Sequence, residues 1–304
     1  MMRHSPRRAN GWTIFLALLL SAGLCVQPLL AQDQAPPNYS PEQLNRMVSR
    51  IALYPDPLLA QILTAATFPD QIPDAAKWAD EHHYLSGQDL ANAITGDQLS
   101  WDPSVQALLP FPSVLDMMAS DMDWTTDLGN AVLAQRPDVM DAVQSERHKA
   151  RDYGYLRSNA QIVVSGGSYI QIMPANPDFI VVPAYDPLIV FAPPRPGFFV
   201  GGAIAFGFGI GIGAWFRPWG WGGSRIVWGS HALFINNARW GRDWGNRRVY
   251  VHPYPGIHRY ARGARVEHHE LIRRSAPERM AARSGRRVRE EHRPGRPGGR
   301  GRPH

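Results

Sequence analysis

The sequence predicts an α+β protein, in which a multi-helix N-terminal domain precedes a small β meander, a Gly/Trp-rich apolar segment and a disordered basic tail. Between residues 39 and 158 the apolar side chains recur at helical spacing, as Leu44, Met47, Val48 and Ile51 do along one helix face. Beyond that stretch they alternate in short β-branched runs, which is the spacing of strands. Charge divides the chain in the same order, because acidic residues dominate the helical part and arginines dominate the C-terminal end.

Residues 1–31 have the layout of a secretory signal peptide. Three arginines among the first eight residues precede an uncharged apolar run from Trp12 to Leu20, and small residues follow. We predict cleavage after Ala31, which places the mature protein in the periplasm or cell envelope and leaves residues 32–40 as a proline-rich spacer. Cleavage there also removes Cys25, the single cysteine, and so excludes disulfides, thiolate metal sites and cysteine nucleophiles from the mature chain.

Proline marks the expected helix starts within residues 39–158. Asp56-Pro57 and Asp102-Pro103 each offer a carboxylate at the N-cap and proline at the first helical position, where the missing N–H costs no hydrogen bond. Further starts are expected at Pro112 and Pro137. A stretch of about 120 residues is long enough to bury one hydrophobic core, so we expect it to fold on its own as a helical domain.

Short strands are expected in residues 159–192. The runs 161–165 and 169–173 flank Gly166-Gly167, a strong hairpin signal, and residues 179–182 supply a third run. Several prolines interrupt the remainder, and a proline cannot donate to a strand ladder, so strands there should be edge strands. We therefore expect a small β meander in this range.

An uncharged apolar run from Phe198 to Phe216 lies within the Gly/Trp-rich segment, residues 193–261. Its nineteen residues approach the ~20 that span a bilayer as a helix. In a helix, the pairs Gly207/Gly211 and Gly209/Gly213 have the GxxxG spacing that lets a second helix approach closely. In a strand, the same four glycines share one face. We favour a membrane-associated helix at 198–216 that self-associates, and buried glycine-rich packing is the alternative.

Tryptophans accompany this run at Trp215, Trp219 and Trp221. Tryptophan is enriched at membrane–water interfaces, because its ring is apolar while its N–H stays hydrated. We therefore expect these side chains to help hold the segment at a membrane surface. The alternative interpretation is a Gly/Trp-rich loop that covers the β meander.

Opposite charges dominate the two ends of the expected mature chain. Residues 39–158 carry 17 Asp and Glu against 8 Lys and Arg, whereas residues 262–304 carry 13 Arg against 5 Glu. The second range has too few apolar residues to form a core, and we expect it to be a disordered tail. Its charge favours anionic envelope components or a membrane surface as partners. Export argues against chromosomal nucleic acid.

Candidate metal ligands occur at Asp80, His82 and His83, where a carboxylate and two imidazoles lie near an expected helix end. Two more ligands would have to come from elsewhere in the fold, and the helix dipole alone favours histidine at a helix C-terminus. The sequence contains neither a nucleophile elbow nor a phosphate-binding loop. It therefore indicates no cofactor and no catalytic residue.

Aromatic and proline motifs follow one another in a specific order. They are Tyr54-Pro55-Asp56-Pro57, Ala76-Lys77-Trp78, Trp101-Asp102-Pro103, Phe111-Pro112, Trp124, Asp138-Val139-Met140-Asp141-Ala142-Val143 and Pro183-Ala184-Tyr185-Asp186-Pro187. This order resembles an exported bacterial family, the domain of unknown function numbered thirty-three hundred, from Pro41 to Phe191. The resemblance implies an exported, mostly helical domain followed by Gly-, Trp- and Arg-rich sequence, and it supplies no catalytic residue or ligand. We interpret the motif residues as structural.

These observations predict an exported, non-enzymatic cell-envelope protein. In this hypothesis the helical domain is an interaction module or scaffold, and the Gly/Trp-rich segment and the basic tail hold it at a membrane surface. Two alternatives stay open, a periplasmic enzyme that uses an acidic groove of the helical domain and a polyanion-binding protein that acts through its tail. A cleft that gathers His82, His83 and carboxylates would favour the enzyme, and dispersal of these groups would favour the scaffold.

Overall fold

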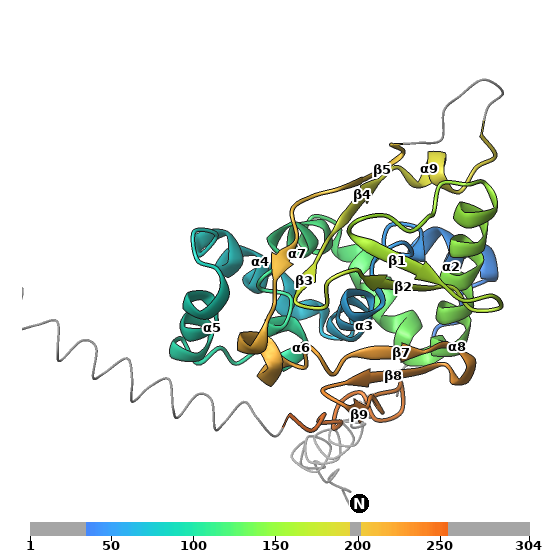
Figure 1. Cartoon of the computed structure of the whole chain (residues 1–304). Helices are drawn as coiled ribbons and strands as arrows, with labels where there is room; N and C mark the ends of the chain where they lie inside the picture. Colours follow the sequence, from blue (N-terminus) through green and yellow to red (C-terminus); the bar gives the residue numbers. More distant parts are fainter. Residues whose placement is uncertain (1–34, 195–201, 255–304) are drawn as a thin grey trace, which may run out of the picture. The chain divides into compact units, whose positions relative to one another are not determined.

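Helices form the N-terminal part of the protein and short antiparallel strands follow them (Figure 1), which confirms the prediction of an α+β fold. The computed structural model describes residues 35–194 and 202–254, and from Pro37 onward these belong to one compact unit. The helical part consists of α2 (Pro41–Val48), α3 (Asp56–Ala65), η1 (Pro69–Gln71), α4 (Ile72–Glu81), α5 (Gly87–Gly96), α6 (Pro103–Gln106), α7 (Pro112–Ala119) and α8 (Met122–Asp152). The predicted signal peptide and basic tail lie outside the described residues.

Local capping explains several helix starts. The Ser40 side chain accepts a hydrogen bond from the Gln43 N–H while the Gln43 side chain accepts from the Ser40 N–H, so α2 begins with a capping box. The Asp102 carboxylate accepts from the Ser104 N–H at the start of α6, as its position before proline predicts. The Asp121 carboxylate caps α8 in the same way.

The expected helix start at Pro137 coincides with a kink inside α8, beyond which a second helical stretch begins. Gln135 has φ −137° and ψ 42°, outside the helical region, and the helix resumes after it. Proline has no N–H and clashes with the carbonyl four residues before it, which breaks the ladder at this point. The Gln135 side chain compensates by accepting from the Tyr39 N–H at 2.6 Å and donating to the Asp138 carboxylate at 3.1 Å. The kink therefore also anchors the beginning of the domain.

Strands form pairs and one three-stranded sheet in the described chain. The predicted hairpin is confirmed, since β1 (Ile162–Ser165) pairs antiparallel with β2 (Gln171–Pro174) around Gly166 at φ +92°, a conformation that glycine adopts freely. The remaining strands are β3 (Phe179–Ile180), β4 (Pro183–Tyr185), β5 (Ile204–Phe206), β6 (Ile210–Gly211), β7 (Arg225–Val227), β8 (Ala232–Ile235) and β9 (Ala238–Arg239). β3 and β4 do not extend the hairpin into a meander, because they pair with β6 and β5 respectively. Short helical turns are α9 (Pro187–Val190), η2 (Ala214–Trp219) and η3 (Trp228–Ser230).

The prediction of a helix at 198–216 is wrong for its described part, residues 202–216. This part forms β5 and β6 and enters η2, with Gly202 and Gly213 at positive φ. Alternating glycines give a helix no continuous apolar face, and each glycine costs about 1 kcal/mol of helix propensity. In a strand, side chains also alternate with a two-residue period, so the same sequence can pair with β3 and β4. Among the described helices, none has both the length and the apolar character that a membrane crossing requires.

The tryptophans expected at a membrane interface lie mostly in the protein core. Trp219 and Trp221 are each 1% exposed, and only Trp215 keeps a substantial exposed area, at 42%. The Trp219 indole N–H donates to the Gln106 side chain at 2.8 Å, and the Trp221 N–H donates to the Ala107 carbonyl at 2.9 Å. Satisfied indole N–H groups remove the need for contact with water.

The helices and the Gly/Trp-rich segment consequently share one hydrophobic core. The large core cluster contains side chains of α2 to α8 together with Phe216, Trp219, Trp221, Leu233 and Trp240. A smaller cluster, built around Leu156, Ile162, Ile170 and Ile172, lies beneath the β1–β2 hairpin. The boundary expected at residue 158 therefore separates no independent core.

We predict that a fragment of residues 37–158 retains helical circular dichroism but loses cooperative thermal unfolding, whereas a chain of residues 37–254 unfolds cooperatively. Without the tryptophan segment, α3 and α6 expose apolar surface that Trp219 and Trp221 cover in the native fold. Circular dichroism melts of the two chains, with dye binding to exposed apolar surface, make the comparison. A cooperative melt of the short fragment at the temperature of the longer chain would contradict the shared core.

Candidate functional site

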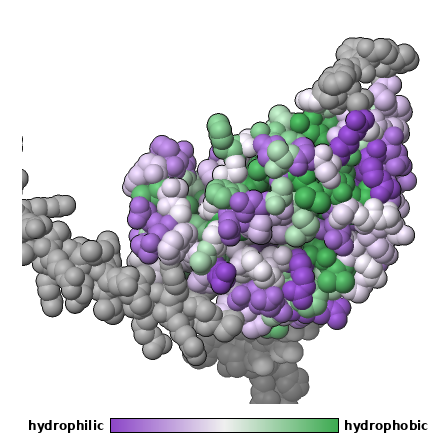
Figure 2. Space-filling model, viewed as in Figure 1, coloured by the Kyte–Doolittle hydropathy of each residue, from purple (hydrophilic) through white to green (hydrophobic). Residues whose placement is uncertain are grey.

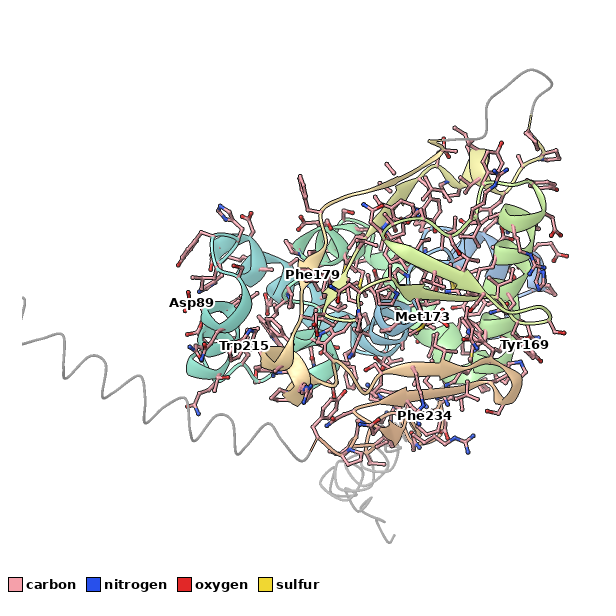
Figure 3. The ribbon with its side chains drawn as sticks, viewed as in Figure 1. Asp89, Tyr169, Met173, Phe179, Trp215 and Phe234 are labelled. Atoms are coloured by element: carbon pink, nitrogen blue, oxygen red, sulfur yellow. The ribbon has the colours of Figure 1, made fainter. Side chains whose placement is uncertain are left out.

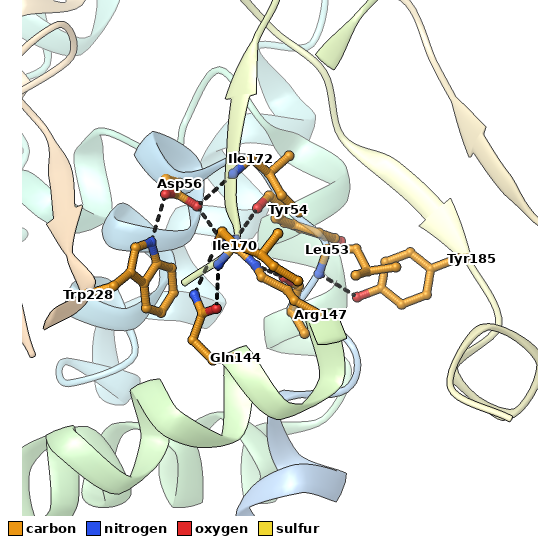
Figure 4. A network of polar contacts seen from close by, with 10 residues as sticks. Leu53, Tyr54, Asp56, Gln144, Arg147, Ile170, Ile172, Tyr185 and Trp228 are labelled. Carbon is orange, nitrogen blue, oxygen red and sulfur yellow. Dashed lines mark hydrogen bonds and ion pairs between the residues drawn. The ribbon is translucent and has the colours of Figure 1, made fainter. Parts of the chain in front are cut away.

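Asp56, a residue of the family motif, forms a buried ion pair (Figure 4). Its helix α3 has Pro55 at the N-cap and no side-chain cap, so the expected capping role of the carboxylate is wrong. The Asp56 carboxylate instead accepts from Arg147 at 2.6 Å, from the Trp228 indole N–H at 2.9 Å and from the Ile172 N–H at 3.4 Å. The two charged side chains are 4% and 0% exposed.

Arg147, on α8, uses its remaining donors on backbone carbonyls. It donates to Ala52 at 2.7 Å, to Tyr54 at 2.9 Å and to Ile170 at 2.8 Å, and its guanidinium lies 4.8 Å from the centre of the Trp228 ring. The pair therefore ties α3 and the loop before it to α8, β2 and η3. Because no part of it reaches solvent, this network supports the fold and is not a binding surface.

Tyrosine and glutamine side chains extend the same network. Gln144 accepts from the Ile170 N–H and donates to its carbonyl, which fixes the entry into β2. The Tyr185 hydroxyl donates to the Ser49 carbonyl and accepts from the Leu53 N–H. Burial raises the pKa of Tyr185 well above its usual value, so the hydroxyl stays protonated.

The other family-motif residues also make structural contacts. The Asp102 carboxylate accepts from both the N–H and the hydroxyl of Ser104. Burial raises the pKa of Asp102, while those hydrogen bonds and the charge of Arg242 oppose the rise. Trp124 is half-buried, its indole N–H donates to the Met47 carbonyl at 2.9 Å, and the Arg50 guanidinium lies 5.2 Å from its ring centre.

Of the candidate metal ligands Asp80, His82 and His83, each histidine uses its Nδ1 in a local contact. The His82 Nδ1–H donates to the Trp78 carbonyl at 2.8 Å, and its ring stacks on the Trp78 ring at 3.9 Å. The His83 Nδ1–H donates to the Asp80 carbonyl at 2.6 Å. Within residues 35–194 and 202–254, no three His, Cys, Asp or Glu side chains are arranged to hold a metal ion.

An open groove runs between the end of α4, the start of α5 and the pair β3–β6. Its volume is about 840 Å³, and its lining includes His82, His83 and Leu90 on the helical side and Phe179 and Trp215 on the other. Figure 3 labels Phe179 and Trp215, which lie on the side of β3 and η2 that faces α5. The lining is mostly apolar, so the groove is the best candidate for a binding site in the described part of the chain.

Two glycines in and beside β6 belong to the strand wall of this groove, together with Ile210 and Phe179. Gly209 and Gly211 line the groove, and a Cβ atom at these positions would lie 3.1 Å and 3.6 Å from the Phe179 side chain. The Phe179 ring therefore packs directly over glycine backbone, a contact that larger residues would weaken or block. The predicted role of Gly207, Gly209, Gly211 and Gly213 in helix packing is accordingly wrong.

In the register that pairs β3 with β6, the backbone groups of Gly211 form no hydrogen bond with β3. The Ile212 N–H donates to the Asp178 carbonyl at 2.9 Å, which makes these residues a hydrogen-bonded pair in the register that joins Phe179 to Gly211. Hydrogen-bonded and non-hydrogen-bonded pairs alternate in an antiparallel ladder. The N–H and C=O of Gly211 therefore point away from β3, and within residues 35–194 and 202–254 no second strand pairs with β6 on that side.

The sequence indicated parts of this groove without assembling it. His82, His83, the glycines and Trp215 were all singled out, but as a metal site and a membrane segment. Phe179 and Asp178 were missed as lining residues, because the groove depends on a pairing of β3 with a strand thirty residues later. The alternation of glycine with isoleucine in residues 209–212 was the one local signal of an exposed strand.

We predict that Asp56→Asn lowers the free energy of unfolding by about 3–5 kcal/mol, because it leaves the Arg147 charge buried without a counter-charge. Denaturant unfolding measures the effect. Asp116→Asn on the exposed side of α7 is the matched control and should change stability by less than about 0.5 kcal/mol. An Asp56→Asn variant as stable as this control would contradict the role of the ion pair.

Comparison with known proteins places this arrangement in one family. The model of the family described as "Protein of unknown function (DUF3300)" matches residues 40–252. A curated relative, the "Uncharacterized protein YacH" of Escherichia coli (strain K12), is 32% identical over 186 residues, which cover 50% of this chain and 30% of the relative. The chain thus spans less than a third of that relative's length. No solved structure matches.

The matched range extends the resemblance seen in the sequence. It continues past Phe191 through β5 to β9 and ends at residue 252, so it includes the tryptophans that complete the core. Both walls of the groove lie within it. Because the match covers more than half of the chain, the protein belongs to the DUF3300 family.

Proposed function

We propose that this protein is an exported cell-envelope interaction module whose groove, between α4–α5 and β3–β6, binds an extended segment of a partner polypeptide. The single observation that carries the proposal is the unpaired edge of β6 beside an apolar helical wall. An extended peptide that adds to a sheet edge gains main-chain hydrogen bonds, and neighbouring pockets select its side chains. The groove offers both features.

The walls of the groove suit such a ligand. Trp215 and Phe179 are 42% and 47% exposed, so each can give up a large apolar area on binding. Aromatic side chains of this kind commonly dominate binding energy. Gly209 and Gly211 lie beneath the Phe179 ring, so this ring can pack close to the β6 backbone.

Export and the envelope location rest on the N-terminal sequence. The order of arginines, apolar run and small residues in residues 1–31 supports a secretory signal. Membrane-surface contact is supported by apolar side chains that the fold leaves in solvent. Leu188 and Ile189 on α9 are 85% and 50% exposed, and Phe208 between β5 and β6 is fully exposed. Figure 2 shows apolar residues gathered over the β4–β5 side, whereas the α5 end is mostly hydrophilic.

A periplasmic enzyme is the second candidate, and one observation favours it. His82, His83 and Asp178 line the same groove. Both histidines donate Nδ1–H to helix carbonyls. The His82 ring stacks on Trp78 and its Nε2 faces the Asp97 carboxylate at 3.9 Å, so His83 is the candidate base. Turnover of fluorogenic ester or peptide substrates that His83→Ala abolishes would support the enzyme.

We predict that peptides selected from a displayed random library against the mature chain bind through the β6 edge. Gly211→Pro should weaken them about threefold to tenfold, because it removes the outward N–H but no β3–β6 hydrogen bond. Gly211→Ala keeps the N–H and is the matched control. Trp215→Ala should weaken binding by about 30-fold.

Calorimetric titration gives these affinities, with circular dichroism as the check on folding. Two results would contradict this mode of binding. Either the library yields no peptide that prefers the unaltered protein to the Trp215→Ala variant, or the peptides bind the Gly211→Ala and Gly211→Pro variants with equal affinity.

We predict that deleting residues 262–304 weakens binding to phosphatidylglycerol–phosphatidylcholine vesicles by more than about tenfold at low salt, since each arginine near an anionic surface contributes about 1 kcal/mol. The loss should shrink as salt screens exposed charges. Replacing the tail arginines with lysine, which keeps the charge, is the control. Vesicle sedimentation measures binding, and equal binding of the full and shortened chains at low salt would leave the tail without this role.

A further inference from the structure

We propose that the ligand of the groove is the arginine-rich C-terminal segment of this chain, residues 286–302. The inference rests on the proposed function of the groove and names the polypeptide that fills it. Charge, aromatic surface, sequence and reach each support the assignment.

Acidic residues flank the helical wall of the groove, although the lining itself is mostly apolar. Residues 70–102 carry seven Asp and Glu against Lys77 alone, and Asp178 lines the groove from the strand side. Asp80 and Glu81 are exposed in the last turn of α4, directly before the lining residue His82. The partial negative charge of the α4 C-terminus adds to this field. Lys77 lies 3.9 Å from Glu81 and Arg217 is exposed on η2, so these two cations offset part of the negative charge.

The aromatic side chains of the groove suit arginine as a ligand. A guanidinium over an aromatic face is attracted by the ring quadrupole. The fold already uses this contact repeatedly, with the guanidinium of Arg242 at 3.7 Å from the Phe68 ring centre and that of Arg225 at 4.3 Å from Phe234. Trp215 and Phe179 offer the same kind of face in the groove and are partly exposed.

The segment has the composition that a narrow, extended site requires. Residues 286–302 contain seven arginines against two glutamates. The stretch Arg293-Pro294-Gly295-Arg296-Pro297-Gly298-Gly299-Arg300-Gly301-Arg302 alternates arginine with proline and glycine. Proline is incompatible with a helix interior and favours extended backbone. Glycine and proline keep the segment narrow, while the arginines supply the charge.

The described chain ends on the correct side of the fold for this contact. Tyr254 is partly buried, and burial together with the charge of Asp102, the N-cap of α6, raises its pKa. The helix α6 in turn contacts η2, which lines the groove. Residues 255–285 can span up to about 100 Å when extended. The segment can therefore reach the groove of its own chain or that of a neighbouring copy.

Site-directed photocrosslinking in the full chain tests this assignment. A benzophenone amino acid replaces Phe179, and mass spectrometry identifies the crosslinked peptides. We expect crosslinks to residues 286–302 at low salt, and loss of most of them when the seven arginines are changed to glutamine. Seven lysines in the same positions should restore part of the yield, since charge remains but the planar group is gone. Crosslinks that never include this segment would overturn the inference.

A second measurement separates failure of this inference from failure of the groove itself. The library peptides that bind the groove should bind the glutamine variant at least about fivefold more tightly than the unaltered chain, because a tethered segment competes at high effective concentration. Equal affinities for both chains would show a functional groove that the tail does not occupy. Loss of peptide binding in both would reject the groove as a binding site.

Discussion

The ion pair between Asp56 and Arg147 is the interaction on which the rest of the structure depends. Removing two charges from water costs free energy that their attraction offsets only when the remaining donors and acceptors are satisfied. Arg147 satisfies its own donors, because it donates to three backbone carbonyls as well as to the Asp56 carboxylate. Those carbonyls belong to the loop before α3 and the start of β2, so one side chain sets the distance between the helices and the first strands.

The position of the groove follows from this constraint and from the shared core. The pair fixes β2 and η3 against α3, and the tryptophans of the following segment then fill the space beside α6. β6 and η2 follow β2 and precede η3 in the sequence, and they line the groove together with the end of α4 and the start of α5. The open edge of β6 is thus placed by contacts that lie elsewhere in the fold.

Features that depend on neighbouring residues could be predicted from the sequence. The α6 cap, the β1–β2 hairpin and the succession of helices are set within a few positions, and the structure has them where expected. Features that depend on distant partners could not. Asp56-Pro57 alone predicts a helix cap. The local sequence does not show that Asp56 pairs instead with Arg147, 91 residues away. Residues 198–216 fit both periods, and only pairing with β3 and β4 decides between them.

The burial of Trp219 and Trp221 implies that the core is completed late in synthesis. Their indole donors meet Gln106 and Ala107, acceptors 113 and 114 residues earlier in sequence. A polypeptide that emerges from its N-terminus first, whether from a ribosome or through a translocation pore, therefore presents the helices well before the residues that close their core. Tertiary structure can lock only after nearly all of the described chain has emerged.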